Sequence, residues 1–87
     1  MRRDHAKLPK DIIRSYILEN LSIPDIDDDC DIFASGTANS LFAIEMMTFL
    51  ERTFNIKVTM DDLDMENFKT VEAASRFVQY KEEVNHV

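Results

Sequence analysis

Hydrophobic residues recur at helical spacing in three segments of the chain. The first series predicts a helix with Pro9 in its opening turn, where proline is tolerated; its members are Leu8, Ile12, Ile13, Tyr16, Ile17 and Leu21. The second predicts a helix over residues 40–54, from Ala43, Met46, Met47, Leu50 and Phe54. The third follows Thr70, a good N-cap, and is expected to fray past Lys81; it comprises Val71, Ala74, Phe77 and Val78.

The segments between these helices complete the predicted architecture. Residues 22–39 form a connection long enough to need a role of its own. We expect its apolar residues, which are interleaved with acids, to pin it to the bundle: Ile23, Ile26, Ile32 and Phe33. Gly36 permits the turn into the next helix. Apolar and polar residues alternate over residues 56–59, which predicts a short extended segment. Residues 61–68 could form only one short helix. The prediction is an all-α bundle of three main helices plus one short helix, over residues 7–84, with tails at 1–6 and 85–87.

Composition and charge limit the possible fold classes, partners and cellular locations. A chain of 87 residues builds one core, and one Gly with two Pro disfavour a sandwich or barrel. The net charge is −7, and residues 15–68 carry twelve acidic but only two basic side chains, which argues against nucleic acid as a partner. A lone cysteine, Cys30, forms no internal disulfide and indicates a reducing compartment such as the cytoplasm. We expect no membrane span and a monomer.

Several kinds of chemistry fit the sequence poorly. An EF-hand that starts at Asp25 would place Cys30 at its sixth position and Gly36 at its twelfth, instead of Gly and Glu, so we expect no metal site. The histidines, His5 and His86, fall in the two predicted tails, far from any nucleophile. Carboxylates around Cys30 disfavour a thiolate, so we expect it to pack against the bundle. The sequence does not favour an enzyme.

Ser40 stands where the long loop ends and the second helix begins, with Asn39 as a candidate N-cap. A hydroxyl at that place is accessible. The positive end of a helix favours a nearby anion, so a phosphodiester on this oxygen would be stabilised. The alternative is that Ser40 is only a second capping residue.

The outward face of the same helix predicts a docking surface. At 100° per residue, the residues that point away from the core stripe are Leu41, Ile44, Glu45, Thr48 and Arg52. Leu41 and Ile44, with Phe42 on their flank, should form an exposed apolar patch ringed by Glu45 and Glu51. The alternative for Phe42 and Phe49 is that the long loop covers them.

Taken together, these positions resemble acyl carrier proteins, a family that includes peptidyl and other thioester carriers. The resemblance extends over residues 31–78 and rests on Asn39-Ser40-Leu41, Ile44-Glu45, Leu50-Glu51, Phe54-Asn55-Ile56 and Thr70-Val71. It implies that a phosphopantetheinyl transferase moves 4′-phosphopantetheine from coenzyme A to Ser40. The thiol of that arm would then carry an acyl group as a thioester, and the protein itself would catalyse no reaction.

The resemblance also implies which residues meet partners. Acyl-loading, modifying and acyltransferase or synthase enzymes would dock on Asn39, Leu41, Phe42, Ile44, Glu45, Thr48 and Glu51. Many family members have Asp where Asn39 stands and an acid where Phe42 stands. These departures favour a discrete carrier for unusual polyketide extender units. The alternatives are an aminoacyl or peptidyl carrier, of the D-alanine or nonribosomal-peptide type, and an acidic adaptor that docks through the second helix without modification.

Overall fold

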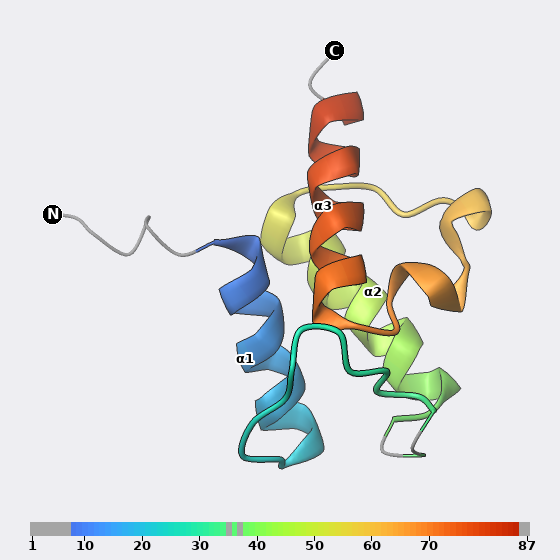
Figure 1. Ribbon diagram of the computed structural model, residues 1–87. Helices are drawn as coiled ribbons and strands as arrows, with labels where there is room; N and C mark the ends of the chain where they lie inside the picture. The colour runs from blue at the N-terminus through green and yellow to red at the C-terminus, as the bar shows by residue number, and fades with distance from the viewer. Residues whose placement is uncertain (1–7, 35, 37, 86–87) are drawn as a thin grey trace, which may run out of the picture.

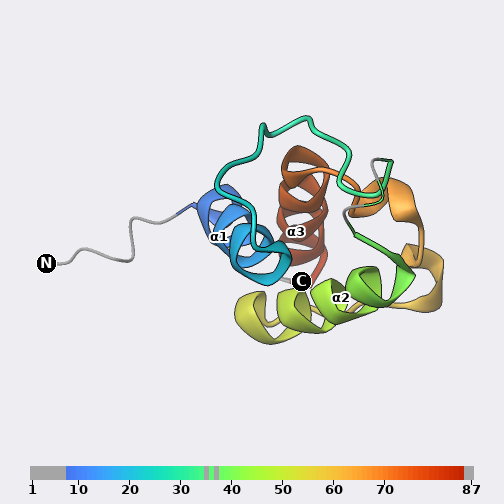
Figure 2. The same cartoon turned by 90° about the horizontal axis from the view of Figure 1, so that it is seen from below.

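Three helices surround one core, as the sequence predicted. The computed structural model describes residues 8–34, 36 and 38–85, so the predicted tail at 1–6 and both histidines lie outside the described residues. The helices are α1 (Pro9–Leu21), α2 (Ser40–Phe54) and α3 (Val71–Asn85), with 3₁₀ turns η2 (Met60–Asp62) and η3 (Met65–Asn67). Helices α1 and α3 run antiparallel side by side, and α2 lies obliquely across them (Figures 1 and 2). The described residues contain no strand, which confirms the all-α prediction.

Local capping explains where the helices begin and end. Pro9 opens α1, and Ser22 ends it in the left-handed conformation. The Ala73 N–H donates to Thr70 Oγ1 at 2.9 Å, so Thr70 caps α3 as predicted. The expected fraying past Lys81 is wrong, because α3 continues to Asn85. Lys81 is buried and paired with Asp62, which anchors the turn that was expected to fray.

The core is built from one face of each helix and from four residues of the connections, Ile32, Ala38, Ile56 and Phe68. Its fully buried large side chains are Phe68, Ile13, Ile17, Ile32, Met46, Leu50, Val71 and Val78. The rings of Phe68 and Phe77 meet edge to face, with centroids 5.1 Å apart. Because residues from the long loop and from the segment after α2 share this core, both connections are part of the fold.

The long first loop is anchored by its apolar residues, as predicted. Ile32 is buried, and the remaining three pack half-buried against the core: Ile23, Ile26 and Phe33. The Ile32 N–H donates to the Lys69 carbonyl at 2.8 Å, which ties the loop to the start of α3. Gly36 has a φ of 80°, the turn that its lack of a side chain allows.

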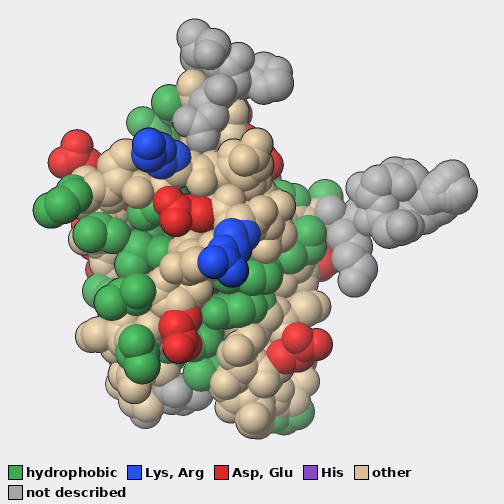
Figure 3. Space-filling view, turned by 180° about the vertical axis from the view of Figure 1, so that it is seen from behind, with side chains coloured by type: hydrophobic (Ala, Val, Ile, Leu, Met, Phe, Trp, Pro, Cys, Tyr) green, Lys and Arg blue, Asp and Glu red, His purple; other side chains and the backbone are tan. Residues whose placement is uncertain are grey.

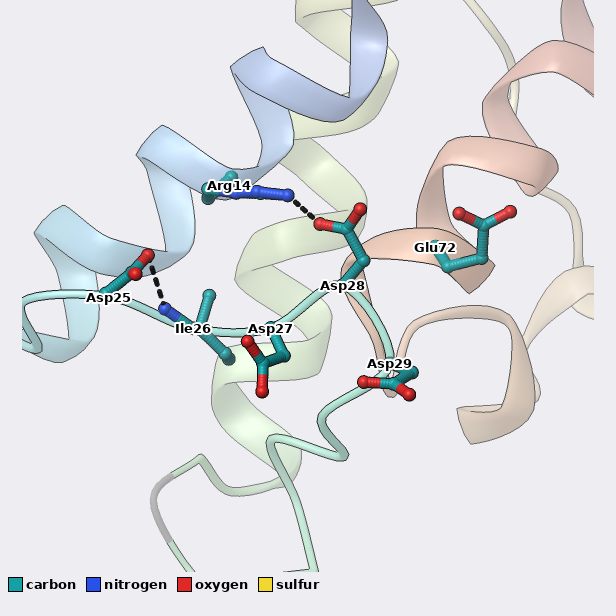
Figure 4. Close-up of a pocket in the computed structure, with 7 residues that line it drawn as sticks. All are labelled: Arg14, Asp25, Ile26, Asp27, Asp28, Asp29 and Glu72. Atoms are coloured by element: carbon teal, nitrogen blue, oxygen red, sulfur yellow. Dashed lines mark hydrogen bonds and ion pairs between the residues drawn. The ribbon is translucent and has the colours of Figure 1, made fainter.

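Charged groups fasten the acidic part of this loop. Asp28 pairs with Arg14 of α1 (Figure 4). It also pairs with Lys10 of the same helix, and its carbonyl accepts from the Glu72 N–H of α3 at 2.9 Å. Ion pairs therefore connect the loop to α1, and a backbone hydrogen bond connects it to α3. Cys30 is exposed, so the expectation that it packs against the bundle is wrong. It borders an open pocket with Ile23, Ile26 and Ile32, which flank the thiol without covering it.

The segment from Ile56 to Phe68, which we call the strap, differs in detail from its prediction. Ile56 is buried and Val58 half-buried while Lys57 and Thr59 are exposed, so the alternation is present without a strand. Two single 3₁₀ turns replace the one short helix. Their cause is local: Thr59 and Asp62 form a reciprocal capping box around η2, and Asp64 caps η3.

Candidate functional site

Ser40 is the first residue of α2, and its side chain is exposed. The preceding residue makes the cap: the Phe42 N–H donates to Asn39 Oδ1 at 2.9 Å, and the Ala43 N–H donates to the Asn39 carbonyl at 3.2 Å. Asn39 therefore caps α2, which is the role that the alternative interpretation gave to Ser40. The arrangement leaves the serine hydroxyl accessible at the positive end of the helix.

This cap provides the first prediction. Asn39→Ala should lower the free energy of unfolding by about 1 kcal/mol, because the Phe42 N–H loses its acceptor. Asn39→Asp, which keeps the acceptor and places a negative charge at the helix N-terminus, should retain wild-type stability. Urea denaturation followed by circular dichroism measures both variants. Equal stability of Asn39→Ala and the wild type would show that the cap contributes nothing.

The outward face of α2 matches its prediction at most positions. Leu41 and Ile44 are 61% and 57% exposed. Glu45 and Thr48 are exposed too, with the Thr48 hydroxyl turned back to the Ile44 carbonyl at 3.3 Å. Glu51 has a different role, because its Oε2 accepts from the Val58 N–H at 2.8 Å and so secures the start of the strap.

The expectation that Phe42 belongs to the exposed patch is wrong. Phe42 is 6% exposed and lies in the core. The Tyr16 ring of α1 stacks on Phe42 and Phe49 at centroid distances of 5.8 and 4.0 Å. A helix, and not the long loop, thus covers these two rings. Burial raises the pKa of Tyr16, and the negative charge of Glu45 adds to the rise, which shows that Glu45 stands at the α1 edge of the outward face.

On the other side of Ser40, α2 and the strap enclose a shallow apolar groove of about 210 Å³. It is lined by Ser40, Ala43, Ile44, Met47, Leu63, Asp64, Met65 and Phe68. At its rim, Leu63 and Met65 are 55% and 42% exposed. Several hydrophobic areas are exposed on the face of the molecule that Figure 3 shows, with a few separate acidic side chains between them.

The sequence interpretation missed this second half of the surface around Ser40. Leu63 and Met65 lie among acids with no helical period, so nothing in the pattern separates them from a solvated connection. Only their closeness to Ser40 in the fold gives them significance. The surface around Ser40 therefore has two apolar parts, one on α2 and one on the strap.

These residues suit the tethering of a phosphodiester and do not suit catalysis. The hydroxyl is exposed, the helix terminus favours an anion, and the groove offers apolar surface beside it. Within residues 8–34, 36 and 38–85 no histidine is present and no group of three or more His, Cys, Asp or Glu side chains could hold a metal ion. None of the described helices is long and apolar enough to cross a membrane.

Comparison with known proteins agrees with this geometry. The family model described as "Phosphopantetheine attachment site" matches residues 11–78. D-alanyl carrier proteins of Streptococcus pyogenes serotype M5 (strain Manfredo), serotype M49 (strain NZ131) and serotype M1 are each 33% identical over 72 residues, which cover 80% of this chain and 87% of the relative. Carrier proteins of this kind interact with phosphopantetheinyl transferases and with acyl-handling enzymes, and this chain is a carrier and not a catalyst. It belongs to the phosphopantetheine-attachment family of carrier proteins, whose members bear a covalent 4′-phosphopantetheine arm.

Proposed function

We propose that Ser40 Oγ carries the phosphopantetheine arm and that the protein is a discrete carrier of thioester-bound intermediates. The observation that carries this proposal is the exposed hydroxyl at the first residue of α2, with Asn39 already making the cap. In the transfer, the serine oxygen forms a bond to the phosphorus of coenzyme A that bears the pantetheine, and adenosine 3′,5′-bisphosphate leaves. The serine proton passes to a base of the transferase, and the protein contributes position and an anion-stabilising helix end.

We infer that the cargo is an aminoacyl group. The D-alanyl carrier relatives match most of this chain and support this alternative over the polyketide one. A small amino acid bound as a thioester needs little from the carrier except a tether and a docking face. The exposed Cys30 agrees with a location in the reducing cytoplasm.

An acyl unit for polyketide synthesis is the second candidate, and a specific observation favours it. The groove beside Ser40 is lined almost wholly by apolar side chains and could shield a short hydrocarbon chain. An aminoacyl group, with its charged ammonium, gains nothing from such a lining. Asp64 is the one carboxylate that lines the groove and is the group to which an ammonium could pair.

The intact mass of the protein isolated from its native host tests the function and the cargo together. We expect the mass of one phosphopantetheine arm plus its load, located by fragmentation to the peptide that contains Ser40. Added mass after mild hydroxylamine treatment, which cleaves thioesters, should fall to that of the arm alone. An unmodified chain in a host that modifies other carriers would contradict the proposal and favour the adaptor.

We also propose that partners dock on the outward face of α2. Ile44→Ala should raise the KM of a phosphopantetheinyl transferase for this carrier by about tenfold, because an apolar side chain central to the surface is truncated. Since Ile44 is 57% exposed, stability should stay within about 0.5 kcal/mol of wild type. Leu8→Ala removes a similarly exposed side chain from the residue that precedes α1 and should leave KM unchanged. Equal KM values for both variants would place the docking face elsewhere.

A further inference from the structure

Lys81 is a buried charge that the carrier function does not require. It lies on α3, is 8% exposed, and donates from Nζ to Asp62 Oδ2 of the strap at 2.8 Å. The two side chains are only 10% and 15% exposed. Most ion pairs of this protein are much more open to water, and a lysine is rarely buried unless it is paired.

Asp62 accepts further hydrogen bonds within the strap. Its Oδ2 also accepts from the Thr59 N–H at 2.9 Å and the Thr59 hydroxyl at 3.0 Å, and its carbonyl accepts from Asn67 Nδ2 at 3.0 Å. Although burial, the largest influence, raises the pKa of this carboxyl, the bonds from Lys81 and Thr59 outweigh it and hold the pKa below its ordinary value. Asp62 thus joins both 3₁₀ turns to α3, with its carboxylate bonded to Thr59 and Lys81 and its carbonyl bonded to Asn67.

The middle of the strap has little else to hold it. Ile56 and Phe68 are buried at its two ends, but no residue between them is buried. Leu63 and Met65, which line the groove beside Ser40, are exposed and are not among the residues that pack against the core cluster. Glu51 bonds only the first part of the strap, at Val58.

We propose that Asp62 and Lys81 are positioning residues, which hold the strap beside Ser40 and so shape the groove and the strap half of the docking surface. The expected effect on docking rests on the proposed function, because it assumes that partner enzymes approach Ser40. Lys81 itself lies outside the lining of that groove and acts only through Asp62. Loss of the pair should free the strap while leaving the three helices in place.

Hydrogen exchange measured by NMR on the full chain tests the positioning step. The reporting amides are those that close the two turns: the N–H groups of Leu63, Asn67 and Phe68 donate to the carbonyls of Met60, Asp64 and Met65. In Lys81→Met, exchange at these amides should rise about tenfold or more, with exchange in α1 and α2 unchanged. Unchanged exchange in the strap, or an equal rise throughout the molecule, would overturn the proposal.

Transfer kinetics test the consequence. With coenzyme A and a promiscuous phosphopantetheinyl transferase, Lys81→Met should raise KM for the carrier about fivefold with kcat unchanged, because docking and not the chemical step is affected. Lys81→Arg, which keeps the charge, should restore KM. Glu66→Gln breaks an exposed ion pair on the same strap and should change neither exchange nor KM. An unchanged KM in a variant whose strap exchanges faster would show that the strap does not contribute to docking.

The proposal can still be tested if Lys81→Met does not fold, and its failure can be distinguished from failure of the proposed function. If Lys81→Met fails to fold, Asp62→Asn combined with Lys81→Met removes both charges, keeps the acceptor for the Thr59 N–H, and is judged by the same exchange and KM criteria. If the wild type accepts no phosphopantetheine, the proposed function fails, and the exchange measurement still decides whether the pair holds the strap.

Discussion

Ser40→Ala is expected to abolish attachment of phosphopantetheine completely. The variant lacks the oxygen that would form the bond to phosphorus, and the residues on either side of it, Asn39 and Leu41, carry no hydroxyl. The fold should be untouched, because Ser40 is exposed and the cap belongs to Asn39. Stability should therefore remain within about 0.5 kcal/mol of wild type. The measurement is intact mass after incubation with coenzyme A and a promiscuous transferase.

Ser15→Ala is the matched control for this experiment. Ser15 is an exposed serine on α1, and its replacement should leave one phosphopantetheine per chain, as in the wild type. Labelling of Ser40→Ala at the wild-type level would move the attachment site to another residue. Absence of labelling in the wild type as well would favour an adaptor that is never modified.

Phe68→Ala is expected to have the largest effect on stability. Phe68 is 1% exposed, meets Phe77 edge to face, and lies where the strap joins α3. Removing a buried ring costs roughly 3 to 5 kcal/mol from lost burial and from the cavity left behind. That is a large share of the ~5–15 kcal/mol that stabilises a typical domain, so a marginal fold would be mostly unfolded.

Urea denaturation at constant temperature measures this loss. Phe68→Leu, which refills most of the volume, should recover a substantial part of the stability. Met60→Ala truncates a strap residue that is 84% exposed and should change the free energy of unfolding by less than about 0.5 kcal/mol. A loss below 1 kcal/mol for Phe68→Ala would mean that the strap end is not part of the cooperative core.

The sequence predicted the helices because each carries its own apolar periodicity and a local start signal, which is Pro9 in α1, Asn39 before α2 and Thr70 before α3. α2 begins and ends where expected, at Ser40 and Phe54, and Thr70 caps α3 through its hydroxyl. The exposed position of Ser40 also followed from local signals alone, because Asn39 and the helix start are adjacent in the chain. The role of Ser40 as the attachment residue stays a prediction until the mass is measured.

Features that depend on contacts between distant segments escaped prediction. The angular position of Phe42 cannot reveal that Tyr16 of α1 stacks on it. Leu63 and Met65 carry no periodic signal, and their proximity to Ser40 arises only when the strap folds back. The end of α3 was misjudged for the same reason, since Lys81 is ordered by a partner nineteen positions earlier.

The pairing of α1 with α3 has a consequence for synthesis of the protein. α1 precedes α3 along the chain, so during synthesis Ile13 and Ile17 have no complete partner until residues 71–78 have emerged. A nascent chain that ends before α3 also lacks Lys81, to which the strap is bound. The core therefore closes only after α3 has been synthesised. A truncated product should remain sensitive to proteases and unable to present Ser40 on an ordered surface.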